Sequence, residues 1–114
     1  MERKIIFYEN HFFDFFSKLD IKAKNKIKYV LELIEQVPKI PKKFLKHLSG
    51  SKGLYEIRVK HQSNIFRIFC CFDEGKLIVL FNPFHKKTNK TPKAELKKAA
   101  QLRKQYFNQK NNNK

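Results

Sequence analysis

The sequence predicts an α+β domain, and three observations support this fold class. Apolar residues recur at helical spacing in the first third of the chain, alternate with polar residues in the middle, and return to helical spacing near the end. The 114 residues, 41% of them hydrophobic, suffice for one core but are too few for a second domain. We expect a short N-terminal strand and two antiparallel helices packed on a small, mostly antiparallel sheet, followed by a C-terminal helix.

The first third of the chain is predicted to form one strand and two helices. Residues 5–8 favour a strand. Asn10 and Asp20 are suited to cap the two helices that follow, and Pro38 ends the second helix near Val37. The apolar stripes that should face the core are Phe12, Phe15, Phe16 and Leu19 in the first helix and Ala23, Ile27, Val30, Leu31 and Ile34 in the second.

The segment 38–53 is predicted to be a basic connector between the helices and the sheet. It contains two prolines, two glycines and five lysines, and no acidic residue. Prolines and glycines interrupt regular structure, so we expect no more than one short turn of helix in this segment.

The middle of the chain should form three strands, and its turns suggest their register. The strands are expected over 54–60, 65–72 and 76–82. A two-residue loop at Glu74 and Gly75 would give the sheet one wholly apolar face toward the helices, whereas a three-residue loop would put Lys76 on that face. We therefore expect the two-residue loop. Its facing pairs would be Phe72 with Leu77, Cys70 with Val79, and Ile68 with Phe81.

The opposite face of this sheet should bring two arginines together. A four-residue loop at 61–64 sets Arg58 directly opposite Arg67. Like charges that face each other across strands destabilise a sheet by up to about 1 kcal/mol, so the pair makes sense if an anion lies between them. Glu56 is the one acid expected on this face. It either serves as a base or holds the two arginines apart.

The end of the chain is predicted to form a last helix. Thr91 and Pro92 suit the N-cap and first-turn positions, and the helical pattern continues to about Phe107. The polar residues beyond it are expected to fray. We therefore expect a single domain over 1–107 and a polar tail over 108–114.

The charge of the chain indicates a polyanionic partner. Lys and Arg number 26 against 10 Asp and Glu, which gives a formal net charge of +16. Residues 38–114 hold nineteen of the basic side chains and only four of the acidic ones. The excess far exceeds what solubility requires, and it favours a nucleic acid as the partner.

The cysteines and the hydropathy pattern indicate a reduced compartment. Cys70 and Cys71 are adjacent within a predicted strand, so they should point to opposite faces and form no bridge with each other. No apolar stretch approaches the roughly 18 to 20 residues of a membrane span, and the apolar run at 5–7 is too short for a signal peptide. The histidines and cysteines lack metal-site spacing. We expect a cytoplasmic protein with no metal, cofactor or membrane partner.

Several motifs, taken in order, carry a family resemblance. They are GLYEIRV at 53–59, NIFRIF at 64–69, LIVLFNPFHKKT at 77–88, and Thr91-Pro92 before a basic helix. This order resembles the HigB-like, phage-derived Gp49-like branch of the RelE/ParE toxin superfamily over roughly 40–107. The resemblance implies a ribosome-dependent endoribonuclease that cuts mRNA. It also implies an adjacent antitoxin with a HigA-like helix-turn-helix domain. A homo-oligomer is possible but is not predicted.

The resemblance implies a catalytic site made from five residues. Arg58 and Arg67 match positions where the superfamily holds the scissile phosphate, and His85, Lys86 and Lys87 match the stretch that transfers protons or holds the phosphate. Cleavage without metal requires the 2′-hydroxyl to attack its own phosphorus, which leaves a 2′,3′-cyclic phosphate. Arginine suits the phosphate because it stays protonated and binds two oxygens at once. Histidine is the side-chain type best suited to proton transfer at neutral pH, so His85 is the candidate general acid.

Further residues are expected to bind RNA around this site. Phe69 or Phe84 would stack on a base or fill a gap under the last helix. The segment before the second strand lacks the glutamate base of some members, which leaves the base open. The other candidate RNA contacts are Lys43, Lys46, Lys60, Asn82 and Lys90.

Two other functions remain open at this point. ParE-type members of the superfamily inhibit DNA gyrase by binding it, and a chain with this fold could also be a non-catalytic RNA-binding module. The converging cationic residues favour the nuclease, because a gyrase inhibitor has no need for such a site.

Overall fold

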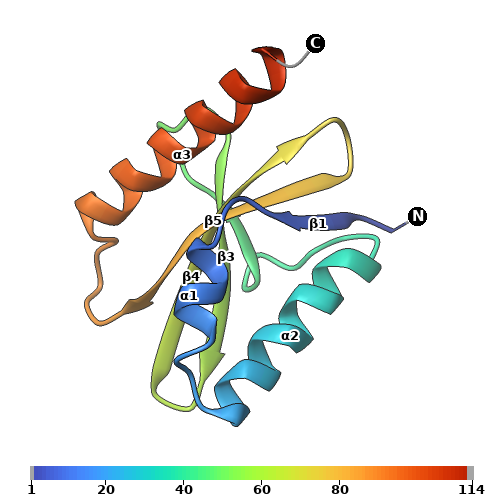
Figure 1. Cartoon of the computed structure of the whole chain (residues 1–114). Helices are drawn as coiled ribbons and strands as arrows, with labels where there is room; N and C mark the ends of the chain where they lie inside the picture. The colour runs from blue at the N-terminus through green and yellow to red at the C-terminus, as the bar shows by residue number, and fades with distance from the viewer. Residues whose placement is uncertain (1, 113–114) are drawn as a thin grey trace.

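The sheet at the centre of the molecule has helices on both of its faces (Figure 1). The structure, a computed structural model, describes residues 2–112. Its strands follow the order β1-β5-β4-β3-β2, in which β1 is parallel to β5 and the other neighbours are antiparallel. The elements are β1 (Lys4–Phe7), α1 (His11–Phe16), α2 (Ile21–Gln36), β2 (Leu45–His47), β3 (Leu54–His61), β4 (Asn64–Asp73), β5 (Leu77–Lys86) and α3 (Lys93–Asn112). The predicted α+β class is confirmed.

The two N-terminal helices begin and end near the predicted positions. The Asp20 side chain caps α2 by accepting a hydrogen bond of 2.8 Å from the Ala23 amide. Asn10 precedes α1, but its side chain makes no capping hydrogen bond. At the other end of α2, Val37 is extended. The Arg3 guanidinium donates there to the carbonyls of Ile34, Val37 and Pro38, at 3.1, 2.6 and 3.0 Å, and so binds acceptors that the helix leaves free.

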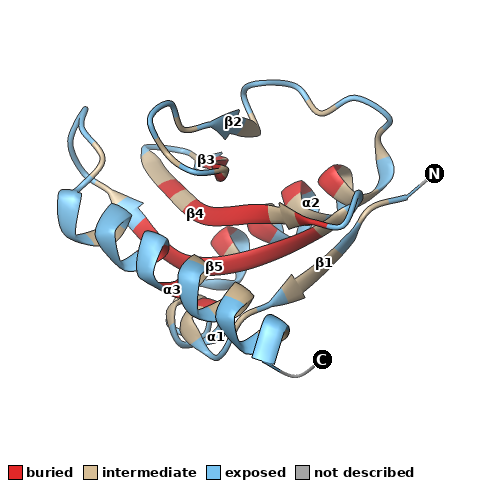
Figure 2. Ribbon diagram, turned by 90° about the horizontal axis from the view of Figure 1, so that it is seen from above, coloured by how far each residue is buried: buried red, intermediate tan, exposed pale blue. Residues whose placement is uncertain are grey.

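Two apolar cores lie on opposite faces of the sheet (Figure 2). The first lies under α1 and α2, and the second lies under α3. Cys70 belongs to the first core and Cys71 to the second, and both are free thiols, as the alternation predicted. The first core contains Ile27, Val30, Ile34, Ile57, Ile68 and Leu80, and the second contains Leu54, Phe69, Val79, Phe81, Phe84 and Leu102.

The predicted register between β4 and β5 is wrong. Asp73 pairs with Leu77, so the loop has three residues rather than two. Glu74 and Gly75 both have positive φ, and Lys76 lies not on the apolar face but in the loop, where its carbonyl accepts a hydrogen bond from the Lys4 amide. An irregularity between Ile68 and Cys70 then shifts the pairing again. As a result, Ile78 and Leu80 face α2, whereas Phe81 packs under α3.

Two further segments differ from expectation. The connector contains the expected short turn, in which the Phe44 and Leu45 amides donate to the Pro41 carbonyl. It is followed by a short strand, β2, that was not expected and that pairs antiparallel with β3. The last helix continues to Asn112, so most of the predicted polar tail is helical; residues 113 and 114 lie outside the described part. This end is held because the Lys110 ammonium lies 2.8 Å from Asp73 and 3.0 Å from Glu74, and the Tyr106 hydroxyl donates to Asp73 at 2.6 Å.

Candidate active site

A carboxylate lies between the two arginines on the α3 side of the sheet. The predicted pairing of Arg58 with Arg67 is confirmed. Glu56 Oε1 lies 3.3 Å from Arg58 Nε and 3.2 Å from Arg67 Nε. Because Glu56 offsets the repulsion, the anion that the pair requires is supplied by the chain itself. The three side chains together keep one net positive charge.

Glu56 is held in place from several directions. Its side chain is only 3% exposed, and its second oxygen, Oε2, accepts a hydrogen bond of 3.4 Å from the hydroxyl of Thr91, just before α3. A buried carboxylate is stable only with such partners, so the segment that leads into α3 completes the cluster.

The two arginines differ in how far they reach into solvent. The Arg58 side chain is 29% exposed and the Arg67 side chain 12%. Arg67 Nη1 donates to the Phe66 carbonyl at 3.3 Å, whereas Nε, although close to Glu56, has no partner in hydrogen-bond geometry. Burial lowers the pKa of Arg67, Glu56 raises it, and Arg58 lowers it. Arginine remains protonated under such influences, so the pair is a preorganised cationic site beside solvent.

His85 does not join the arginines. It pairs with Phe66, and the two rings lie 5.2 Å apart on the face covered by α1 and α2. Lys86 pairs with Ile65, two residues before Arg67, and therefore shares the face of the arginines. Lys87 follows the end of β5 and is exposed. All three residues reach the same end of the sheet, but His85 lies on its other side.

Asn82 has a structural role that the sequence did not suggest. It was expected to face Arg67, yet Phe84 occupies that position because of the irregular pairing along β5. Asn82 is buried, and its Nδ2 donates to the Glu95 carbonyl at 3.0 Å and to Glu95 Oε1 at 3.1 Å. Its side chain thus fastens the first turn of α3 to the sheet, and it is not available to RNA in this arrangement.

The aromatic pair on this face is buried under the last helix. Phe69 has no exposed surface and stacks on Phe84 with ring centroids 5.4 Å apart. Of the two roles considered for these rings, the structure agrees with packing under α3 and leaves no free ring face of Phe69 for a base.

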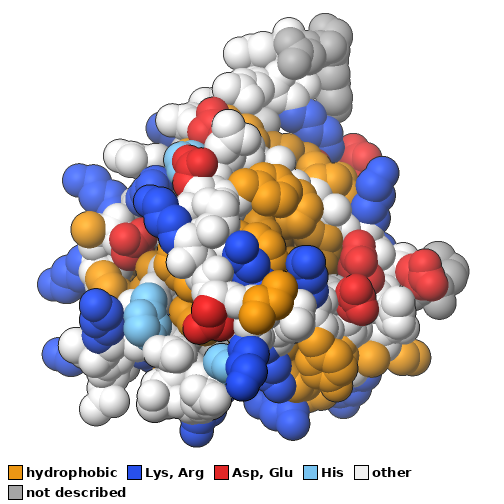
Figure 3. Space-filling model, turned by 60° about the horizontal axis from the view of Figure 1, so that its bottom comes forward, with side chains coloured by type: hydrophobic (Ala, Val, Ile, Leu, Met, Phe, Trp, Pro, Cys, Tyr) orange, Lys and Arg blue, Asp and Glu red, His pale blue; other side chains and the backbone are white. Residues whose placement is uncertain are grey.

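The expected RNA-binding lysines are all exposed. Lys46 pairs with Glu56, and Lys60 pairs with Ile65, so both share the face of the arginines. Lys43 lies 5.0 Å from the ring centroid of Phe44, and Lys90 is in the loop before α3. Figure 3, in which the bottom of Figure 1 comes forward, shows basic side chains spread around an apolar middle. On this face the basic side chains are therefore dispersed and do not form one patch.

Sequence reasoning missed two residues that build this region, Thr91 and Glu95. Thr91 was assigned only to the start of the helix. Glu95 was not considered, although it is the one acidic residue after Glu74 in a strongly basic stretch. An isolated acid among many lysines is a signal for a specific partner, and Glu95 has one in Asn82.

Neither a cluster of metal ligands nor a membrane-spanning helix occurs among the described residues. No three His, Cys, Asp or Glu side chains in residues 2–112 gather as metal ligands would. Within the same residues, no helix is long and apolar enough to cross a membrane.

A family model matches the chain over residues 14–104, which is most of its length. The description of that family is "Phage derived protein Gp49-like", and its members are RelE/ParE-like toxins. No curated protein matches the sequence. The match includes the arginine pair, Glu56 and the strand that ends in Lys86, and it supports the HigB-like branch named from the motifs. The chain belongs to the Gp49-like family of RelE/ParE-like toxins.

Proposed function

We propose that this toxin is a ribosome-dependent endoribonuclease that cuts mRNA without a metal ion and inhibits translation in the cytoplasm. The observation that carries the proposal is the pair Arg58 and Arg67, held side by side by one buried carboxylate. A structural role alone does not require two like charges opposite each other in a sheet. A phosphate that gains negative charge would be stabilised by this pair, which keeps one net positive charge after Glu56 is counted.

In the proposed reaction, the RNA 2′-hydroxyl attacks the adjacent phosphorus and loses its proton to a base. The 5′-oxygen leaves with a proton from an acid, and a 2′,3′-cyclic phosphate remains. Arg58, the more exposed of the pair, would contact the phosphate directly, and Lys86 would add charge from the neighbouring strand. Both favour the transition state over the substrate because the charge they bind is larger there.

The proton-transfer residues are less defined than the phosphate site. Glu56 accepts contacts from both arginines and from Thr91, which favours the role of holding the arginines over the role of base. His85 and Lys87 stay in the proposal as residues that RNA would meet while passing over the end of β5. To reach His85, the RNA strand would have to cross to the other face of the sheet.

The proposed partners follow from the family and the charge. RelE/ParE-like toxins are paired with antitoxins, and we infer a HigA-like helix-turn-helix antitoxin for this chain. Lys43, Lys46, Lys60 and Lys90 would contact phosphates of messenger or ribosomal RNA, and binding should weaken steeply as salt rises.

The test is to incubate the purified protein with translating ribosomes and map the mRNA ends. We expect cuts that bear 2′,3′-cyclic phosphate, and cutting that persists with EDTA at levels that leave ribosomes intact. Arg67→Ala should abolish the cuts, whereas Lys26→Ala, remote on α2, should not change them. Uncut mRNA together with inhibited DNA supercoiling would identify a gyrase inhibitor instead. Binding without either effect would identify an RNA-binding module.

A further inference from the structure

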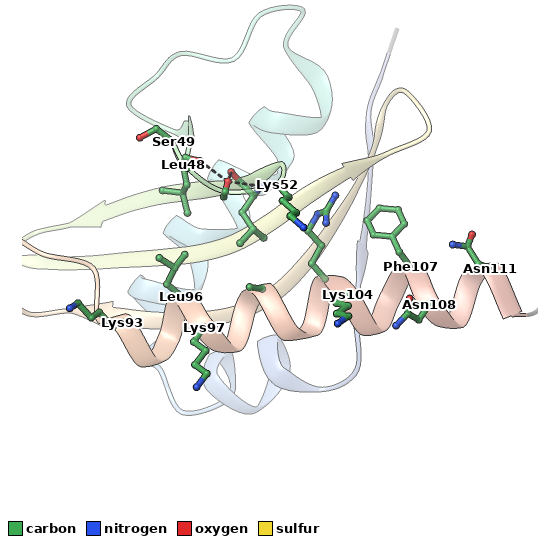
Figure 4. Close-up of a pocket in the computed structure, with 15 residues that line it drawn as sticks. Leu48, Ser49, Lys52, Lys93, Leu96, Lys97, Lys104, Phe107, Asn108 and Asn111 are labelled. Atoms are coloured by element: carbon green, nitrogen blue, oxygen red, sulfur yellow. Dashed lines mark hydrogen bonds between the residues drawn. The ribbon is translucent and has the colours of Figure 1, made fainter.

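A long groove runs between α3 and the loop before β3, apart from the arginine pair. Its volume is about 940 Å³, and along α3 it extends from Lys93 to Asn111. With a rise of about 1.5 Å per helical residue, this stretch is about 27 Å long. Figure 4 shows Leu48 on the loop and Leu96 on α3 pointing toward one another across the groove, with Phe107 farther along the helix.

The wall of the groove opposite α3 is a preformed turn. The Ser51 hydroxyl donates to the Leu48 carbonyl at 2.6 Å and accepts from the Leu54 amide at 3.1 Å. Gly53 follows with φ near +100°, a conformation that favours glycine. A side chain at this position would also meet the Arg103 guanidinium, because an added Cβ would lie 3.7 Å from its Nη2. These contacts within the chain fix the shape of the wall, so no bound partner is needed to form it.

The lining combines an apolar floor with a cationic border. Leu48, Leu54, Leu96, Ala100 and Phe107 supply the apolar surface. The charged lining residues are all basic: Lys52, Lys93, Lys97, Arg103 and Lys104. Leu96 is 37% exposed, which makes it one of the few large apolar side chains left open to solvent. An occupant that matches this lining carries apolar groups on one side and negative charge around them.

The aromatic ring in the groove already contacts two side chains of the chain itself. The Arg103 guanidinium lies 4.9 Å from the ring centroid of Phe107, and the Tyr106 ring meets Phe107 edge-on at 5.0 Å. Single-stranded RNA binds through phosphates and through stacking on free ring faces, and it gains little from aliphatic side chains such as Leu48 and Leu96. The lining thus favours an acidic polypeptide over RNA.

We propose that this groove binds an acidic, amphipathic segment of a partner protein, with its apolar side chains between Leu48 and Leu96 and its carboxylates toward the bordering lysines. The length of the groove matches a helix of about five turns, because one turn rises about 5.4 Å. The proposal depends on the length and lining of the groove and does not require that the protein cleave RNA. Where the proposed toxin function holds, it also assigns the surface by which a neutralising antitoxin holds the chain.

The experiment uses a defined probe, a fluorescein-labelled synthetic helix with leucines on one face and glutamates elsewhere. We expect saturable binding by fluorescence polarisation. Ala100→Glu places a carboxylate on the groove floor and should weaken binding by at least about tenfold, or about 1.4 kcal/mol. Ala94→Glu makes the same charge change on the same helix, at an exposed residue outside the groove, and should leave binding nearly unchanged. Circular dichroism of both variants checks that they fold.

Three outcomes would overturn this proposal. Equal weakening by the two variants would show an effect of overall charge alone, and equal binding of a probe with serines in place of leucines would remove the role of the apolar floor. Displacement of the probe by an RNA of similar length at a lower concentration would favour nucleic acid. Arg67→Ala should retain probe binding, and Ala100→Glu should retain mRNA cutting. The two proposals can therefore fail separately.

Discussion

The two faces of the sheet are built from the same strands but have different compositions. Beneath α1 and α2 the buried side chains are apolar, with Ile27, Val30, Ile57 and Ile68 almost inaccessible to solvent. Beneath α3 the core also contains Glu56, Asp73 and Asn82, the buried polar residues of the described chain, and each contacts α3 or the segment before it. The first face supplies stability, whereas the second combines stability with charged groups that folding alone does not need.

Two single substitutions at adjacent residues of β4 should give the largest contrast between the face that supplies stability and the face that carries charged groups. Arg67→Ala should abolish detectable mRNA cutting, since the loss of a preorganised charge lowers a rate by about 10² to 10³. Its loss in the free energy of unfolding should be smaller than that of a core substitution, because Glu56 keeps Arg58 and Thr91 as partners. Ile68→Ala, on the other face, should reduce that free energy by about 2 to 5 kcal/mol because it opens a cavity in the first core. Urea unfolding and mRNA end mapping measure the two quantities. Similar unfolding losses for both variants would remove the contrast.

Replacement of Glu56 tests whether the carboxylate holds the arginines or acts as a base. Glu56→Ala leaves two adjacent cations without a counter-ion, and we expect it to destabilise the fold by about 1 to 3 kcal/mol, since Arg58 is partly screened by solvent. Glu56→Gln keeps the shape and should lose less stability. If cutting by folded Glu56→Gln falls as far as with Arg67→Ala, the carboxylate is a base instead.

Tyr106 offers a pH-dependent test at the other end of α3. Burial and the hydrogen bond to Asp73 raise the pKa of Tyr106 to about 12. Its unfolded pKa is about 10, so its contribution to stability is complete below pH 10 and is lost as the pH rises toward 12. Tyr106→Phe should lose about 1 kcal/mol at neutral pH and show a weaker decline over that range. Urea unfolding at several pH values provides the measurement. Parallel curves for the two proteins would contradict this account.

The smallest effect is expected at the cysteines, where the two faces should behave alike. Burial raises the pKa of Cys71 to about 11 and that of Cys70 well above its ordinary value. Neither thiol is then a thiolate at pH 8, so both should resist a thiol reagent until urea unfolds the chain. Rapid reaction of Cys71 alone would mean that the α3 side opens more readily than the α2 side.

Much of the fold followed from local sequence signals. Asp20 caps α2, Pro38 limits that helix, and the arginine pair lies in the predicted register, because each feature depends on a few neighbouring residues. The register of β5 was predicted wrongly at two points: the loop after β4 has three residues rather than two, and an irregularity between Ile68 and Cys70 then shifts the pairing again. Periodicity alone does not show where a strand has one extra residue.

The candidate site was predictable in part for the same reason. Arg58 and Arg67 could be placed by counting along two strands. For His85 only the end of the sheet was predicted, not the face: it pairs with Phe66 and so lies on the α1 and α2 side, opposite the arginines. The role of Asn82 in holding α3 depends on Glu95, which lies in another element, and no local pattern links the two.

The parallel pairing of β1 with β5 also constrains the order in which the molecule folds as it is synthesised. Lys4 to Phe7 are synthesised well before their partners, Leu77 to Leu80, and Arg3 lacks its carbonyl acceptors until the end of α2 has formed. The N-terminal strand therefore remains an unpaired edge until most of the chain has emerged, and Thr91 reaches Glu56 later still. The cluster of Arg58, Arg67 and Glu56 is consequently completed only after the segment that leads into α3 has been synthesised, later than the two strands that carry the arginines.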